Sequence, residues 1–174
     1  IYFVMFVVVA FALGRATASY IPKFKSNIHM SEYMFKLYPT WSTTPFNFAF
    51  SLIEANKLER AELLLKSNMS LEHPNWVKPY FYGKIKQKKG HINEAYELFY
   101  KAAVMTRKGG YFPFADSHLA EIMIQRKDYK SAQKLLNGLL YTEIKNPVIF
   151  FKAKQLLKVV EAEISKTAIE DKKP

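Results

Sequence analysis

Histidine and carboxylate side chains are the residues of this chain that could perform acid–base chemistry or bind a metal ion. No two of the four histidines lie four residues apart, the spacing with which a helix presents two zinc ligands. We expect surface or helix-boundary positions for them, without convincing carboxylate partners; they are His29, His73, His91 and His118. Glu94, Glu97 and Glu121 are expected to be ordinary polar-face residues of helices rather than a catalytic carboxylate pair.

Other patterns of catalytic or cofactor-binding residues are missing from the sequence. There are no cysteines, which excludes disulfides, thiolate metal sites and cysteine nucleophiles. Gly109-Gly110 stands alone and does not form a phosphate-binding loop, and no nucleophile elbow is present. Asn68-Met69-Ser70 is a formal N-glycosylation sequon. The sequence therefore predicts a protein that is not an enzyme and has no catalytic residue, metal or cofactor.

The composition is that of a globular domain with a basic surface. Hydrophobic residues make up 49% of the chain and charged residues 24%, which is too apolar for a disordered chain. The formal net charge of +11 would suit an anionic partner. However, the densest basic run, Lys84 to Lys89, has the spacing of a solvated helical face, and no nucleic-acid-binding signature is present. Nucleic acid is therefore not the expected partner.

The amino-terminal residues form an uncharged apolar run, IYFVMFVVVAFAL. A helix needs about 20 apolar residues to cross a bilayer. Because the sequence opens at an isoleucine, we predict that residues 1–19 hold a truncated transmembrane segment and its basic flank at Arg15. A cleaved signal peptide is the alternative, since Ala16-Thr17-Ala18 has the small-residue cleavage pattern, and a buried core helix is a third reading. The protein is expected at a membrane. These residues do not determine on which side of the membrane the rest of the chain lies.

A ten-residue sequence pattern occurs three times along the rest of the chain. It begins at Asn56, at Gly90 and at Lys127, and its alanines are spaced 34 and then 37 residues apart. Gly109-Gly110 marks where the three additional residues are expected to loop out. Each alanine has another small residue twelve positions before it and a large apolar residue four positions after it. The six small residues are Ala49, Gly83 and Ala120, followed by Ala61, Ala95 and Ala132.

This pattern resembles the tetratricopeptide repeat, with three repeats over residues 41–142. The resemblance implies an all-α solenoid of antiparallel helix pairs, in which the small residues allow the two helices of a pair to cross closely. The family's turn glycine is kept only at Gly90, while Asn56 and Lys127 take its place in the other two repeats.

Further helices are expected on both sides of the repeats. Residues 20–40 contain a lead-in helix, Ser26 to Tyr38, that closes at Pro39. Residues 143–167 form a capping helix whose first turns are apolar and whose last turns are charged. We predict a disordered tail over residues 168–174.

The resemblance also places a candidate partner-binding surface on the concave groove that the first helices line. Aromatic anchors beside exposed lysines would suit an extended peptide or an acidic segment. Alternatively, the phenylalanines complete the core or pack on the lead-in helix. The groove positions are Phe46, Phe50, Tyr80, Lys84, Lys88, Phe114, Ser117, Glu121 and Gln125.

The function that these patterns favour is a membrane-anchored scaffold for protein–protein interactions, without catalytic residues. The order of an apolar segment, Arg15, a short helix ending at Pro39 and then repeats is also similar to the carboxy-terminal end of some membrane enzymes. These are multi-span glycosyltransferases that use polyprenyl-linked sugars and O-antigen-ligase-like proteins, which would make this region accessory to chemistry elsewhere. A periplasmic assembly factor released by signal cleavage is the third possibility.

Overall fold

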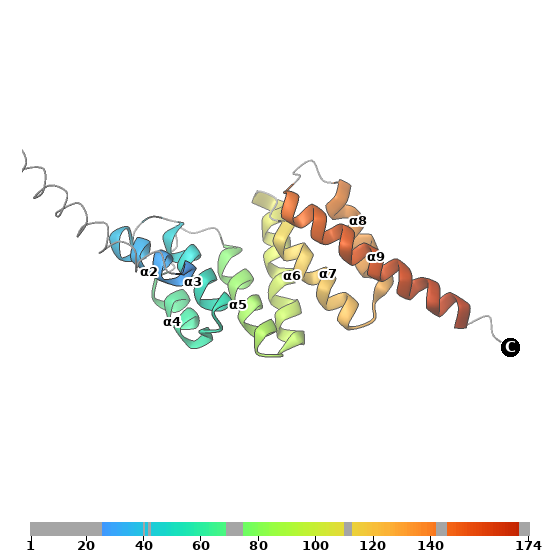
Figure 1. Ribbon diagram of the computed structural model, residues 1–174, viewed down its shortest axis with the longest axis horizontal. Coiled ribbons are helices and arrows are strands. Elements are labelled where there is room, and N and C mark those ends of the chain that lie inside the picture. The colour runs from blue at the N-terminus through green and yellow to red at the C-terminus, as the bar shows by residue number, and fades with distance from the viewer. Residues whose placement is uncertain are drawn as a thin grey trace, which may run out of the picture. The chain divides into compact units, whose positions relative to one another are not determined.

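In the computed structural model, residues 26–39, 41, 43–68, 75–109, 113–141 and 146–170 are described, and they form eight α-helices and no strand (Figure 1). The prediction of an all-α protein is confirmed for this part of the chain. None of these helices is both long enough and apolar enough to span a membrane. The predicted transmembrane segment, residues 1–19, lies outside the described residues. The helices are α2 (Asn27–Leu37), α3 (Thr44–Glu54), α4 (Leu58–Asn68), α5 (Val77–Lys88), α6 (Ile92–Gly109), α7 (Pro113–Gln125), α8 (Tyr129–Tyr141) and α9 (Pro147–Glu170).

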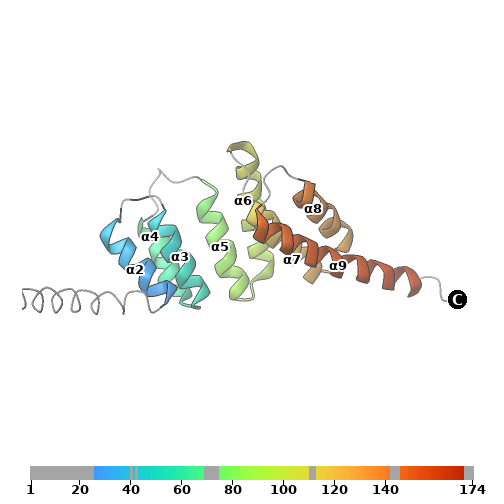
Figure 2. The ribbon, with the colours of Figure 1, turned by 45° about the horizontal axis from the view of Figure 1, so that its top comes forward.

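The chain divides into two compact units, Ile1–His73 and Pro74–Pro174. In the first unit, α3 packs against both α2 and α4. In the second unit each helix from α5 to α9 packs against the next one along the chain, and α7 also contacts α9 (Figure 2). The helix pairs α3–α4, α5–α6 and α7–α8 correspond to the three repeated segments of the sequence.

One turn geometry joins the two helices in all three pairs. In the first turn, the Lys57 amide donates a hydrogen bond to the Leu52 carbonyl at 2.8 Å, and the Asn56 amide donates to the Ile53 carbonyl at 3.0 Å. The same two bonds recur around Gly90 and around Lys127, and all three central residues have a positive φ, of 56°, 79° and 61° in chain order. This is the Schellman arrangement that ends a helix in a left-handed residue.

Small side chains lie at the closest approaches between paired helices. All five of the repeat alanines are completely buried. Gly83 on α5 faces the ring of Phe99 on α6 so closely that an added Cβ would lie 2.9 Å from two of the ring carbons. A second buried cluster joins α7, α8 and α9 in the same unit and includes Leu136, Ile149 and Val160. The second unit therefore holds both a close crossing of α5 on α6 and a buried apolar cluster over α7 to α9.

The flanking helices begin at polar caps. The Ser26 hydroxyl accepts a hydrogen bond from the His29 amide at 3.4 Å, and α2 ends two residues before Pro39. At the start of α9, the side-chain oxygen of Asn146 accepts hydrogen bonds from the amides of Val148 and Ile149, at 3.0 and 3.3 Å.

Two boundaries differ from the sequence-based prediction. Helix α9 continues to Glu170, so residues 168–170 are helical rather than part of a disordered tail, because no proline or glycine interrupts the helix there. Helix α6 continues to Gly109, so this glycine is helical rather than part of a loop. Gly110, where the additional residues are also expected to loop out, lies outside the described residues.

Candidate functional site

Three titratable side chains of α7 and α9 meet in the second unit. The Nδ1 atom of His118 lies 3.0 Å from Oε2 of Glu121, one turn further along α7. The Nζ atom of Lys152, on α9, lies 2.8 Å from Oε1 of the same carboxylate. Residues three apart share one face of a helix, so α7 presents His118 and Glu121 together. The carboxylate thereby links a histidine of its own helix to a lysine of the neighbouring one.

The His118 ring is packed against aromatic side chains from two other helices. It stacks on Phe99 with a centroid distance of 4.7 Å and an interplanar angle of 10°, and the Tyr80 ring lies 5.9 Å away. Only 15% of the His118 side chain is exposed. Burial lowers the pKa of His118, and the hydrogen bond to Glu121 offsets this effect only in part. The ring is therefore neutral at pH 7, and its Nδ1 must carry the proton, because an ionised carboxylate can only accept.

The Glu121 carboxylate stays ionised although it is largely buried. Burial opposes its ionisation, but hydrogen bonds from His118 and Lys152 outweigh that effect and lower the pKa of Glu121 to about 2. A charge held between two donors in this way is suited to joining α7 to α9. It is poorly suited to accepting a proton from a substrate at neutral pH.

Further polar side chains are buried in this unit. Lys84 on α5 is 8% exposed, and Ser117 on α7 is 1% exposed. Asp116 is buried beside Ser117. The Ser117 hydroxyl oxygen has no hydrogen-bond partner among the described residues. In the part of the chain that the structure describes, no three histidine or carboxylate side chains are grouped closely enough to hold a metal ion.

The predicted groove residues of the second unit do not form one exposed surface. Lys84 is buried, and the expectation that it is exposed is wrong, because α5 is buried on most of its sides, at Val77, Phe81 and Ile85 as well. Tyr80 and Ser117 are also buried, and Phe114 and Glu121 are half-buried; only Lys88 and Gln125 are exposed.

The remaining two groove positions belong to the first unit, on α3. Phe46 is half-buried, whereas Phe50 is 45% exposed. Phe50 is also one of the side chains that line a cleft between α2 and α3.

Two histidines have carboxylate partners that the sequence analysis missed. Besides the His118–Glu121 pair, Nδ1 of His91 lies 2.9 Å from Oε1 of Glu94, whose Oε2 lies 2.6 Å from Nζ of Lys86. The hydrogen bond from Lys86 is the main cause that lowers the pKa of Glu94, and the hydrogen bond from His91 lowers it further. In both cases the histidine and the glutamate are three residues apart, within α7 for His118 and at the start of α6 for His91, which directly precedes that helix. This spacing could have indicated the pairs. Of the other histidines, His29 is exposed, and His73 lies outside the described residues.

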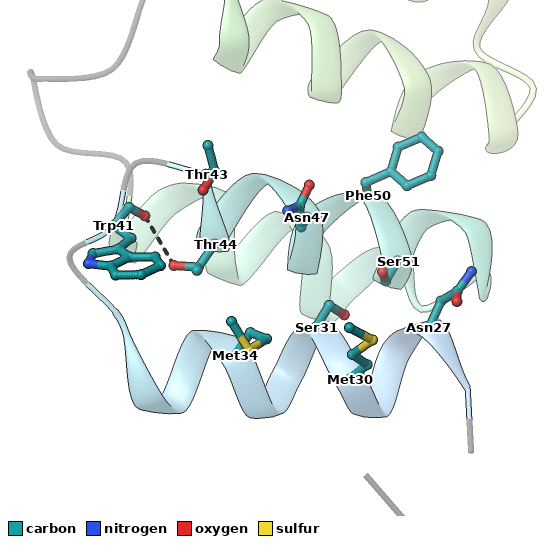
Figure 3. A pocket seen from close by; sticks show the side chains of 10 residues that line it. All are labelled: Asn27, Met30, Ser31, Met34, Trp41, Thr43, Thr44, Asn47, Phe50 and Ser51. Carbon is teal, nitrogen blue, oxygen red and sulfur yellow. Dashed lines mark hydrogen bonds between the residues drawn. The ribbon is translucent and has the colours of Figure 1, made fainter. Parts of the chain in front are cut away.

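The cleft between α2 and α3 has a volume of about 390 Å³. Figure 3 shows Met30 and Met34 rising from α2 toward α3, with Trp41 at one end of the cleft and Asn27 and Ser51 at the other. Apart from Phe50, none of the lining residues was singled out from the sequence as a binding residue, since the cleft arises from the packing of one helix on the next. The described residues that line the cleft are Asn27, Met30, Ser31, Met34, Trp41, Thr43, Thr44, Asn47, Phe50 and Ser51.

Comparison with protein-family models, with curated proteins and with solved structures gave no match to this chain. Its function is therefore inferred from the geometry of the helix pairs, the charged cluster and the cleft.

Proposed function

We propose that this chain is a non-catalytic scaffold for protein–protein interactions, built from tetratricopeptide-type repeats and held at a membrane by residues 1–19. The observation that carries the proposal is the identical turn of the three helix pairs, centred on Asn56, Gly90 and Lys127. A lysine in the left-handed region is strained, so its presence in register with a glycine supports a common repeat unit rather than chance similarity. Repeated helix pairs stack through their neighbours and leave extended faces open to partners.

Exposed aromatic side chains support a binding role. Trp41 is 55% exposed, and Phe50, Tyr141 and Phe151 are large apolar residues that are exposed as well. Exposed aromatic residues of this size are typical anchors of protein–protein contacts. The net charge of +11 favours association with acidic partners, most strongly at low ionic strength. The partner is therefore proposed to be a protein or peptide that has an acidic surface.

Site-specific photo-crosslinking in native membranes tests the scaffold role. A photoreactive residue is placed at Phe50, Lys88 or Gln125 on the first helices of the pairs, and at Glu59 or Lys134 on second helices as controls; all five positions are exposed. We expect discrete protein adducts from the first-helix positions and few from the controls. No adduct from any position, or equal adducts from both sets, would exclude a scaffold that binds through the first helices.

Membrane attachment is tested separately on the full-length protein. With residues 1–19 present, the protein should stay in the membrane fraction after an alkaline wash, because an apolar helix in the bilayer is not held by charge. Deletion of residues 1–19 should release it. A protein that is washed off in both forms would contradict the anchor and leave the scaffold role to the crosslinking experiment.

A further inference from the structure

None of the ten described residues that line the cleft between α2 and α3 is charged. Among the described residues, the charged side chains nearest in sequence are Glu32 and Lys36 on α2, which pair with each other at 3.3 Å, and Glu32 also lies 3.6 Å from Arg60 on α4. None of these three lines the cleft. A charged ligand group placed against these described residues would lose water without gaining a counter-ion, so this lining disfavours charged ligands.

The lining of the cleft is mostly apolar and adaptable. Met30 and Met34 contribute flexible thioether side chains, which adjust to apolar groups of different shape. Trp41 and Phe50 add aromatic surface that is half exposed in this structure and would be covered by a ligand. A volume of about 390 Å³ is at the small end of the range of ligand pockets and suits one or two large side chains.

The Trp41 end of the cleft is held in place before any ligand binds. The Thr44 hydroxyl donates hydrogen bonds to the carbonyl of Tyr38 at 2.6 Å and to that of Trp41 at 3.0 Å. The Trp41 ring also stacks on Tyr38 with a centroid distance of 4.3 Å and an interplanar angle of 16°. A site whose aromatic wall is already ordered loses less conformational entropy on binding.

The polar lining residues match the hydrogen-bonding groups of a peptide backbone. Asn27 and Asn47 are exposed amides, and each offers both a donor and an acceptor, as a peptide group does. The hydroxyls of Thr43 and Ser51 add further groups of the same kind. A lipid acyl chain has no such groups and would remove water from these side chains without replacing its hydrogen bonds.

We propose that this cleft binds an uncharged, extended peptide segment of a partner protein by accepting one or two of its apolar side chains. The inference rests on the proposed scaffold function and specifies one contact of that scaffold. It differs from the acidic contact that the basic composition favours, so the partner would present an apolar segment to α2 and α3 in addition to any acidic surface.

Fluorescence of Trp41 provides a direct test. The chain has two tryptophans, so in a Trp76→Phe background Trp41 is the only one left. The probe is a pool of blocked peptides of about nine residues, a length that spans roughly 30 Å when extended, with Leu, Ile, Phe or Met at alternate positions and Ser, Asn or Gly between them. A matched acidic pool has Asp and Glu in place of the apolar residues, and phosphatidylcholine vesicles represent lipid. We expect a saturable blue shift with the apolar pool only. No shift, or an equal shift with the acidic pool or the vesicles, would overturn the proposal.

A pair of charge variants locates the binding site. Asn47→Asp places a negative charge in the cleft and should weaken binding of the apolar pool at least tenfold. Gln155→Glu adds the same charge to the exposed face of α9 and should leave binding unchanged. Both residues are exposed, so circular dichroism should show intact folding in both variants. Equal binding by the two variants would place the peptide outside the cleft.

The cleft can fail as a site while the scaffold role stands. Crosslinking from Lys88 is therefore repeated with the Asn47→Asp variant in native membranes. Adducts from Lys88 together with no binding of the apolar pool would support the scaffold and exclude the cleft as its peptide site. Saturable binding of the pool with no adduct from any position would instead exclude a scaffold that binds through the first helices.

Discussion

The Nζ atom of Lys152 lies 2.8 Å from the Glu121 carboxylate and joins α9 to α7. These two helices also share a buried apolar cluster, which includes Ala120 and Ala153. The ion pair therefore sits beside an apolar contact, where its charges are shielded from solvent more than those of a surface pair. Removing one partner should be costly for this reason.

The substitution Glu121→Gln is expected to lower the free energy of unfolding by about 1–3 kcal/mol at pH 7, because Lys152 loses its counter-ion. The matched control is Glu163→Gln, which breaks the more exposed Glu163–Lys166 pair on α9 and should cost no more than about 1 kcal/mol. Thermal unfolding followed by circular dichroism measures both. Equal losses would show that the α7–α9 ion pair contributes no more than a surface pair does.

The pH dependence of that loss follows from the lowered pKa of Glu121. Because the folded protein keeps this carboxylate ionised down to about pH 2, its contribution is present above pH 4.5 and is lost as the pH falls from 4.5 toward 2. The difference in stability between the wild type and Glu121→Gln should therefore be largest above pH 4.5 and shrink below it. A difference that does not change with pH would mean that the side chain acts through packing alone.

His118 should make the protein less stable in mild acid. Its pKa in the folded state lies below the usual 6.5, so the unfolded chain takes up a proton first as the pH falls through 6.5, and unfolding becomes easier. In addition to Glu121, two charged groups act on this ring: Lys84 and Lys152 both oppose its protonation. The variant His118→Gln should lose part of the decrease in urea midpoint between pH 7.5 and 5.

The exposed His91 supplies the control for this effect. His91→Gln should retain the contribution of His118 to the pH dependence, since that contribution is attributed to burial of His118. The readout is the slope with pH rather than the absolute stability, because either substitution also removes a contact to a glutamate. Identical slopes for the two variants and the wild type would exclude His118 as the source of the acid sensitivity.

The helix pairs were predictable because their signals are local. The three alanines and the small residues twelve positions before them fix where two helices must cross closely, and all of them are buried. The left-handed turn at Lys127 could not be predicted from the preferences of lysine. It becomes visible only through its register with Gly90, for which a positive φ carries no steric cost.

The candidate sites were predictable only where they depend on one helix. The three-residue spacing of His118 and Glu121 is visible in the sequence, whereas the third member, Lys152, comes from a helix whose packing no local pattern predicts. The burial of Lys84 was missed for a similar reason, because it depends on what surrounds α5. The cleft likewise exists only once α2 packs on α3, so Met30 and Trp41 carry no binding signal of their own.

Replacing two helical glycines with alanine should change the stability of the protein in opposite directions. At Gly83 the new Cβ would lie 2.9 Å from the Phe99 ring, so Gly83→Ala should force a shift in packing and cost about 1–3 kcal/mol. At Gly138 on α8 an added Cβ meets no atom within 4 Å, so Gly138→Ala should gain about 0.5–1 kcal/mol from helix propensity. Thermal midpoints that move in the same direction would contradict the close α5–α6 crossing.

The last prediction follows from the repeated turn and concerns Lys127, which has a φ of 61°. A residue with a Cβ pays about 1–2 kcal/mol in the left-handed region, whereas glycine does not. Allowing for the greater freedom of glycine in the unfolded chain, Lys127→Gly should raise stability by about 0.5–1 kcal/mol. Gly90→Ala, at the equivalent turn with a φ of 79°, should lower stability by about 1 kcal/mol. Lys134→Gly is the control, because the same change at an exposed position inside α8 should cost about 1 kcal/mol. Thermal unfolding midpoints measure these effects. We expect the midpoint of Lys127→Gly above that of the wild type, and the midpoints of the other two variants below it. If Lys127→Gly falls below the wild type as Lys134→Gly does, this turn does not have the left-handed geometry of its equivalent at Gly90, and the three helix pairs do not share one turn.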